Sequence, residues 1–285
     1  MYILNGTEET KNPIMYYRGA VTNNNVKFAN YCWKIVRTTE TGGVKLIYNG
    51  KPDSNGQCTA TGSSTLIQSR VAFNTNYNDN AYVGYMYGTA GSATYEETHA
   101  NTNNSTIKTV IDEWYSQNMT EYTEKLEDTV WCNDRSVVQD GSFSGTGVGK
   151  EQTRYGPGNR LFVNKTPSLA CVNENDRFTV SEENGNGELE YPVALLTADE
   201  IAYAGEVWIQ ENSSYYLCNN VWWLSLSPDY FNGNCANALF VSSAGDLNYS
   251  NVDVTNGVRP SISLKPGVKV QSGTDGTREN PYVIE

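Results

Sequence analysis

Apolar residues recur at helical spacing in one stretch of the chain. Positions i, i+3, i+4, i+7 and i+8 are taken by Ile107, Val110, Ile111, Trp114 and Tyr115. Such a one-sided apolar stripe is typical of an amphipathic helix that packs on a core. Asn104 or Ser105 can cap the first turn with a side-chain oxygen. The pattern therefore predicts a helix from Ser105 to about Glu124.

A second, shorter helix is predicted to begin after Thr197. Thr197 and Glu200 have the spacing of a capping box, in which each side chain accepts from a backbone N–H that would otherwise be unpaired. Apolar residues follow this box, and Gly205 is a helix stop signal. These signals predict a short helix between Thr197 and Gly205.

Most other apolar segments are short and rich in β-branched and aromatic residues. Val26–Arg37 and Val44–Tyr48 flank a turn that contains glycine, which is a hairpin signal. Further strand candidates are Asn159–Val163, Arg177–Val180, Tyr191–Leu196, Ala238–Val241 and Val258–Leu264. Between Gly50 and Asn104 the sequence is mostly Gly, Ser, Thr and Asn, which predicts long irregular loops. Two helices, such loops and a strand-rich C-terminal third predict an α+β fold with a twisted antiparallel sheet.

Composition narrows the classes of partner. Charged residues make up only 18% of the 285 residues, and the net charge is −12. A nucleic acid partner is not expected, because no basic stripe exists to neutralise phosphates. No run approaches the roughly 18 apolar residues that a membrane-spanning helix needs, so direct insertion into a membrane is not expected either.

The chain is expected to hold one domain between two short segments. Residues 1–14 form a polar leader, residues 15–267 the domain, and residues 268–285 a tail or a linker to a following domain. The first five residues lack the charged region and long apolar run of a signal peptide. We therefore expect this sequence to be a piece of a longer chain.

Six cysteines can form three disulfides. They are Cys32, Cys58, Cys132, Cys171, Cys218 and Cys235. An even count fits an oxidising, extracellular compartment, although many pairings are open. Pairing of sequence neighbours predicts Cys32–Cys58, Cys132–Cys171 and Cys218–Cys235, each adding about 3–4 kcal/mol by restricting the unfolded chain. Free buried thiols in a reduced protein are the alternative.

Residues 229–256 are small, polar and aromatic, and they lie between two hydrophobic, strand-like segments. This contrast indicates a rigid frame that displays an adaptable surface, as recognition proteins do. Tyr230 and Tyr249 are the preferred contact candidates, because each offers area and a hydroxyl at low entropic cost. Of the adjacent Trp222 and Trp223, one is expected to fill the core, since neighbours on a strand face opposite sides.

The flanking segments carry a family resemblance. They contain Trp222-Trp-Leu-Ser-Leu-Ser-Pro228 and Gly257-Val-Arg-Pro260. With two helices before them, these motifs resemble the C-type lectin-like fold of bacterial and phage surface proteins. The relatives include formylglycine-generating-enzyme-like modules and variable proteins diversified by retroelements. Cys32-Trp-Lys-Ile-Val-Arg37 and Asn280-Pro-Tyr-Val-Ile284 also resemble the two ends of surface modules from gut Firmicutes.

The resemblance implies a diversified binding surface. Mutation of template adenines in an asparagine codon cannot produce Trp, Lys, Glu, Gln or Met, and none of these occurs from Leu224 to Leu264. The implied ligand-binding residues are Asp229, Tyr230, Asn232, Asn234, Asn237, Leu239, Ser243, Asp246, Asn248, Tyr249, Ser250, Asn251, Asp253 and Asn256. Cys235 falls among the changeable positions, which leaves its pairing with Cys218 open.

The resemblance also implies a role and a location for the domain. The expected partner is a protein or a glycan on another cell or host surface. The domain would be extracellular, attached to the cell surface through a longer chain like a bacterial adhesin. Recognition would be non-catalytic and would need no cofactor.

Catalysis has less support in the sequence. The single histidine, His99, lies in a polar stretch, and no nucleophile elbow is present. The glycine-rich Gly141–Gly149 lacks the Gly-Lys-Ser/Thr ending of a phosphate loop. Asp134, Asp176 and Asp199 could gather around calcium, but we expect solvated or capping carboxylates and no metal. A glycan-active hydrolase with paired carboxylates, or a structural spacer of an adhesin, remains the alternative.

Overall fold

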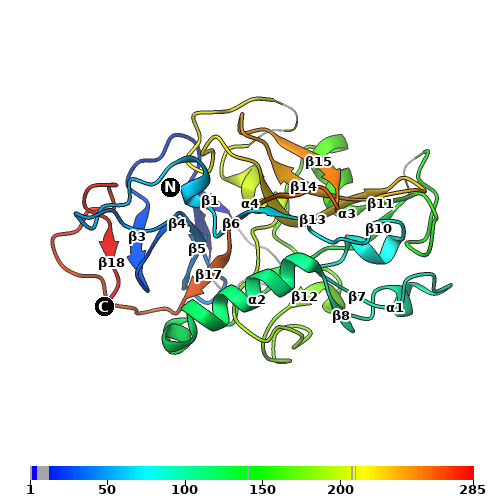
Figure 1. Ribbon diagram of the computed structural model, residues 1–285, viewed down its shortest axis with the longest axis horizontal. Helices are drawn as coiled ribbons and strands as arrows, with labels where there is room; N and C mark the ends of the chain where they lie inside the picture. Colours follow the sequence, from blue (N-terminus) through cyan, green and yellow to red (C-terminus); the bar gives the residue numbers. More distant parts are fainter. Residues whose placement is uncertain (1, 5–12, 140, 207, 209) are drawn as a thin grey trace.

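Two β-sheets form the body of the protein, and short helices flank them (Figure 1). The computed structural model describes residues 2–4, 13–139, 141–206, 208 and 210–285. In these parts of the chain each sheet has seven strands. The fold is therefore mixed α+β, as predicted, with mostly sheet and few short helices.

The first sheet brings together the beginning and the end of the sequence. Its strand order is β1-β2-β4-β3-β18, and β5 pairs with both β4 and β17. The strands are β1 (Tyr2–Leu4), β2 (Ile14–Tyr16), β3 (Asn25–Phe28), β4 (Tyr31–Thr38), β5 (Val44–Tyr48), β17 (Ser261–Leu264) and β18 (Tyr282–Val283). Within it, β18 pairs parallel with β3 and the other pairings are antiparallel.

The segments expected to flank the domain contribute strands to this sheet. Within the expected tail, β18 joins β3, and the N–H of Cys58 donates to the carbonyl of Arg278 at 2.8 Å. Residues 268–285 are therefore integrated into the domain, because a parallel strand pair and loop contacts hold them there. Of the expected leader, β1 pairs with β2, while residues 1 and 5–12 lie outside the described residues.

The second sheet holds most of the C-terminal third. Its order is β10-β11-β13-β14-β15, with β16 parallel to β13 and β6 antiparallel to β16. The strands are β6 (Gln68–Val71), β10 (Val137–Val138), β11 (Thr153–Tyr155), β13 (Trp223–Phe231), β14 (Ala236–Val241), β15 (Leu247–Asn251) and β16 (Asn256–Val258). Two small ribbons pair β7 (Met86–Tyr87) with β8 (Asn103–Asn104), and β9 (Trp131–Cys132) with β12 (Arg177–Phe178).

Both predicted helices are confirmed. Helix α2 (Thr106–Asn118) is capped by the side chain of Ser105, and a 3-10 turn over Thr120–Lys125 follows it. Its apolar stripe packs on the main core, where Ile107, Ile111 and Tyr115 are fully buried and Val110 and Trp114 partly so. Figure 1 shows the helix along one side of both sheets. Helix α4 (Ala198–Tyr203) begins with the predicted capping box of Thr197 and Glu200. Two shorter helical pieces are α1 (Tyr95–Thr98) and α3 (Gly156–Gly158).

Several strand predictions are wrong in part or in full. Tyr191–Leu196 forms only an isolated bridge, between Ala194 and Ser261, because Pro192 has no N–H to donate to a ladder. Strand β12 covers only Arg177–Phe178 of the predicted Arg177–Val180, and Val258–Leu264 is divided between β16 and β17 at Arg259 and Pro260. Val26–Arg37 is broken into β3 and β4 by a two-residue turn at Ala29 and Asn30, which have φ of 52° and 63°. Two positive φ values in succession give the turn a twist that matches a tight hairpin. Asn159–Val163 is a π-helical turn that continues α3, because Pro157 at the start of α3 favours helix and Leu161 is buried by that turn.

The Trp222–Pro228 and Gly257–Pro260 motifs, which flank residues 229–256, contact each other. Trp223 pairs with Gly257 in the parallel β13–β16 ladder, and Trp222 O accepts from Gly257 N at 2.9 Å. A Cβ on Gly257 would lie 2.6 Å from both Leu66 Cδ1 and Trp222 O, so glycine is required at this close approach. As expected, Trp223 is fully buried, while Trp222 is 49% exposed.

Two of the three predicted disulfides are confirmed. Cys32–Cys58 and Cys132–Cys171 are formed, whereas Cys218 and Cys235 are free thiols. The third pair is wrong because the two cysteines lie at opposite ends of the β13–β14 hairpin. Cys218 Sγ lies near Ser243 O at 3.8 Å, and Cys235 lies in the turn. A strand as long as β13 spans about 30 Å, well beyond disulfide reach.

Candidate functional site

The segment predicted to bind a ligand is divided between the interior and the surface. Five of its members are buried: Asp229, Asn237, Leu239, Asp246 and Asn256. Asn237 and Leu239 are on β14, whose six residues are all buried between β13 and β15. Asp229 is paired with Arg154, Asp246 closes the turn before β15 by bonding to Ser242, and Asn256 pairs with Val71 on β6. The expectation of outward contact is therefore wrong for these five side chains.

The remaining members are reachable from solvent. They are Tyr230, Asn232, Asn234, Ser243, Asn248, Tyr249, Ser250, Asn251 and Asp253, all half-buried or exposed. Several of them lie on β15, which ends the hydrogen-bonded order of its sheet. An edge strand leaves side chains and backbone groups accessible to a partner. The surface candidates thus gather along β15 and the ends of β13.

Five aromatic rings form a continuous row on this sheet, which we call the aromatic face. The row runs Phe162, Trp208, Tyr249, Tyr230, Phe143. The ring centroids of Tyr230 and Tyr249 lie 5.1 Å apart in an edge-to-face arrangement, and Trp208 stacks beside Tyr249 at 5.9 Å. Such pairs are favourable beyond the area that they bury. The two tyrosines singled out from the sequence are therefore neighbours.

Arg154 adds a cation to one end of the aromatic face. Its guanidinium lies 4.4 Å from the ring centroid of Phe143 and 5.3 Å from that of Tyr230. These distances are within the range of cation–π attraction. Arg154 is on β11, which pairs with β13, so the register Arg154↔Tyr230 places the two side by side. Arginine, tryptophan and tyrosine are the residue types that dominate binding energy at interfaces.

Asp229 supports this face from beneath. Its Oδ1 accepts from Arg154 Nη1 at 3.0 Å, and the side chain is fully buried. A Cβ on Gly158 would lie 2.0 Å from Asp229 Oδ1, so the backbone of α3 closes over the carboxylate. Burial raises the pKa of Asp229 to about 7, while Arg154 opposes the shift. Asp229 therefore positions the arginine and does not reach a ligand.

A change of Asp229 to asparagine tests this burial. Asp229 keeps its proton to about pH 7 in the folded protein, whereas in the unfolded chain it loses it near the ordinary pKa of 3.8. The free energy of unfolding therefore falls as pH rises from about 4 to about 7, and it changes no further above that range. The wild-type protein is therefore expected to lose stability relative to Asp229→Asn between pH 5 and pH 8. Urea denaturation of both proteins at the two pH values measures the difference. Parallel stability curves would show that Asp229 titrates normally.

Most of the aromatic face has no signal in the sequence. Phe143 lies in a loop, Phe162 in the π-helical turn Asn159–Val163, and Trp208 in a segment that bridges to Leu247. Arg154 is on the short strand β11, for which the sequence carries no strand signal. Phe143 belongs to the glycine-rich Gly141–Gly149 segment, and the structure places its ring against Tyr230. Sequence spacing cannot reveal such a row, because only the tertiary fold brings these segments together.

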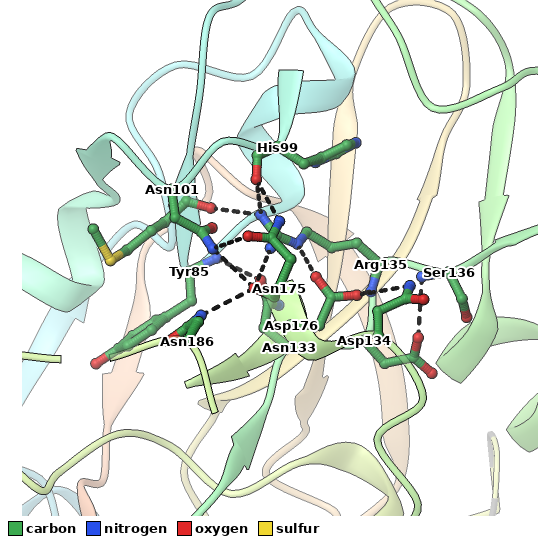
Figure 2. A network of polar contacts seen from close by, with 12 residues as sticks. Tyr85, His99, Asn101, Asn133, Asp134, Arg135, Ser136, Asn175, Asp176 and Asn186 are labelled. Atoms are coloured by element: carbon green, nitrogen blue, oxygen red, sulfur yellow. Dashed lines mark hydrogen bonds and ion pairs between the residues drawn. The ribbon is translucent and has the colours of Figure 1, made fainter. Parts of the chain in front are cut away.

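The three aspartates considered for calcium are paired with arginines. Asp176 binds Arg135 at 2.6 Å in a buried network that Figure 2 shows. Asp134 and Asp199 both bind Arg160, at 2.5 and 2.7 Å. Across the described ranges, no group of three or more His, Cys, Asp or Glu side chains is arranged to hold a metal ion.

His99 lies beside this network and is fully buried. Its Nε2 is 2.9 Å from Gly147 O, and its carbonyl accepts from Arg135 and from Asn175 (Figure 2). Burial, with Arg135 nearby, lowers the pKa of His99 to about 3. The imidazole is therefore neutral at physiological pH and enclosed, although its sequence neighbours are polar.

Comparison with known proteins gives no relative. No family model, no curated protein and no solved structure matches this chain. None of the described helices has the length and apolar character to cross a membrane.

Proposed function

We propose that this domain recognises a macromolecular partner without catalysis, and that the aromatic face is its binding surface. The observation that carries the proposal is the row of five rings with Arg154 at one end. Tyr249 is 41% exposed at the centre of the row. The prevalence of Tyr, Trp and Arg favours a protein partner over a glycan.

The fold that we propose for this chain is C-type lectin-like. Its support is the order of the elements: an early hairpin β4–β5, helices α2 and α4, then the β13–β14 hairpin and a final pairing of β17 with β5. The pairing of Trp223 with Gly257 is further support, because it joins the two motifs that carry the resemblance. Two disulfides fit an extracellular domain, and we propose attachment to a cell surface through a longer chain.

Diversification by a retroelement remains part of the proposal, limited to the accessible positions. Variation at Tyr230, Asn248, Tyr249 and Asn251 would alter the surface, whereas variation at Leu239 would disturb the core. The encoding locus tests this idea. A reverse transcriptase gene and an adenine-rich near-copy of the segment for residues 222–264 are expected beside the gene. A locus without either would remove diversification and leave a fixed binding face.

Alanine at Tyr230 or Tyr249 is expected to weaken binding at least about tenfold, because central aromatic anchors each contribute about 2 kcal/mol or more. The partner is first found by probing the domain on arrays of cell-surface proteins and glycans. Affinities of the variants are then measured by surface plasmon resonance.

Tyr87→Ala is the matched control for this experiment. Tyr87 pairs edge-to-face with Tyr82 at 5.2 Å, much as Tyr230 pairs with Tyr249, but β7 lies far from β15 in Figure 1. Its substitution is expected to leave the affinity unchanged. Equal losses of affinity in Tyr87→Ala and Tyr249→Ala would point to a general effect on folding. Unchanged affinity in all three variants would place the binding site elsewhere.

A further inference from the structure

A cavity lies between the β4–β5 hairpin, the N-terminus of α4 and three loops. Its volume is about 470 Å³, and it shares no lining residue with the aromatic face. Sites for small molecules in proteins commonly measure about 300–1,000 Å³. The cavity therefore has the size of a small-molecule site, and it lies outside the surface proposed for recognition.

Charged side chains of both signs line this cavity. Seven carboxylates and four cationic side chains contribute to the wall, and none of its lining residues in the described chain is aromatic. A sugar ring or a flat aromatic ligand would find no ring on which to stack. The surplus of carboxylates favours a ligand that carries positive charge.

Most of the charges at the base of the cavity are paired with one another. Glu200 binds Arg37 at 2.8 Å and Lys45 at 3.0 Å, and these three side chains are buried. Arg160 binds Asp199 at 2.7 Å on the same wall. These pairs make the base rigid, because each buried charge is held by its partners.

Two buried charged groups keep hydrogen-bonding capacity that no described residue uses. Arg37 is 5% exposed; its Nε and Nη1 donate to Glu200, Glu40 and a backbone carbonyl, whereas Nη2 donates to none of the described groups. Glu127 is 9% exposed; its Oε2 accepts from Thr39 at 2.8 Å, and Oε1 accepts from nothing in the described chain.

Glu127 differs from the other buried acids at the cavity. It has no ion pair in contact among the residues described. Burial raises its pKa and Glu40 adds to the shift, while the hydrogen bond from Thr39 and the more distant charges of Lys45 and Arg37 oppose it. A carboxylate that is removed from water and lacks a cation is costly unless a bound group compensates it. The cavity therefore offers a donor, Arg37 Nη2, and a carboxylate that gains from a positive charge.

We propose that this cavity binds a small zwitterion of the amino-acid type, with a cationic side chain. Arg37 donates to the carboxylate of the ligand, and Glu127 accepts from its α-ammonium group. The remaining carboxylates of the wall attract the side-chain cation. Binding is non-covalent, so no bond is made or broken. The proposal is independent of the aromatic face, since the two sites share no residue.

Isothermal titration calorimetry of the whole chain with L-lysine tests the proposal. Norleucine lacks the side-chain cation, cadaverine lacks the carboxylate, and N-acetylglucosamine is a neutral sugar. Lysine is expected to bind with one-to-one stoichiometry and at least about tenfold more tightly than each of these, because a charge-assisted hydrogen bond contributes about 1.5–3 kcal/mol.

Glu127→Gln keeps the shape of the side chain and removes its charge, and it is expected to weaken lysine binding at least about tenfold. Glu121→Gln, on an exposed turn outside the cavity, is the matched control and is expected to bind as the wild type does. Thermal unfolding of both variants verifies their folding. Absence of lysine binding to the wild type, equal binding of cadaverine or the sugar, or unchanged affinity in a folded Glu127→Gln protein would each overturn the proposal.

Discussion

Replacement of Arg259 by leucine is expected to destabilise the protein by about 3–5 kcal/mol, a large part of the stability of an ordinary domain. Arg259 is fully buried at the end of the Gly257-Val-Arg-Pro260 motif. Its three guanidinium nitrogens donate to Tyr48 O, Leu217 O and Asn49 Oδ1 at 3.0–3.1 Å. Leucine would leave these three acceptors without their donor, each at a cost of about 1–3 kcal/mol.

Arg259 joins the two sheets and therefore has no simple substitute. It connects the end of β5 to the segment before β13, and its guanidinium lies 5.0 Å from the ring centroid of Trp223. Burial lowers the pKa of Arg259 to about 10, so the group is still protonated at neutral pH. Lysine keeps the charge but cannot span three acceptors, and Arg259→Lys is expected to lose about 2 kcal/mol.

Guanidinium denaturation at pH 7 measures both effects. Arg70→Leu on β6 is the matched control, because Arg70 is exposed and its loss should change stability by no more than about 0.5 kcal/mol. An Arg259→Leu protein that unfolds at the wild-type denaturant concentration would show that the three acceptors find other donors. The side chain of Arg259 would then not be needed to hold the two sheets together.

Local signals in the sequence were sufficient for the two longer helices. The stripe of Ile107, Ile111 and Tyr115 and the box of Thr197 with Glu200 depend on residues three or four apart, and both helices form where these signals lie. The β4–β5 hairpin and two disulfides between sequence neighbours are also present. Such interactions need little knowledge of distant parts of the chain.

The candidate site depended on contacts that the sequence does not reveal. Asn237 and Leu239 have the small or polar surroundings of a surface strand, yet β14 is covered from both sides. Phe143 and Trp208 have no distinctive neighbours, yet the fold places them beside Tyr230 and Tyr249. Burial in a central strand and adjacency between distant segments are both properties of the tertiary structure. Composition could therefore point to a region for the candidate surface without defining which of its residues are exposed.

The second large effect is expected at Arg135, the centre of the network in Figure 2. Arg135 is fully buried, binds Asp176 at 2.6 Å and donates to the carbonyls of Met86 and Asn175. Arg135→Met is expected to cost about 3–5 kcal/mol, because it leaves the carboxylate of Asp176 buried without its cation. Asp176 also accepts from the backbone N–H of Arg135 and from Asn173, so it remains fixed in place.

A double-mutant cycle separates the ion pair from the packing around it. Asp176→Asn removes the negative charge, and the double variant Arg135→Met/Asp176→Asn leaves no unpaired charge at this position. Its loss of stability is therefore expected to be smaller than the sum of the two single losses, by about 1–3 kcal/mol. Urea denaturation at pH 7 of the wild type and the three variants gives the coupling. Strict additivity would mean that Arg135 stabilises the domain through its carbonyl contacts alone, because the charge of Asp176 would then cost nothing when left behind.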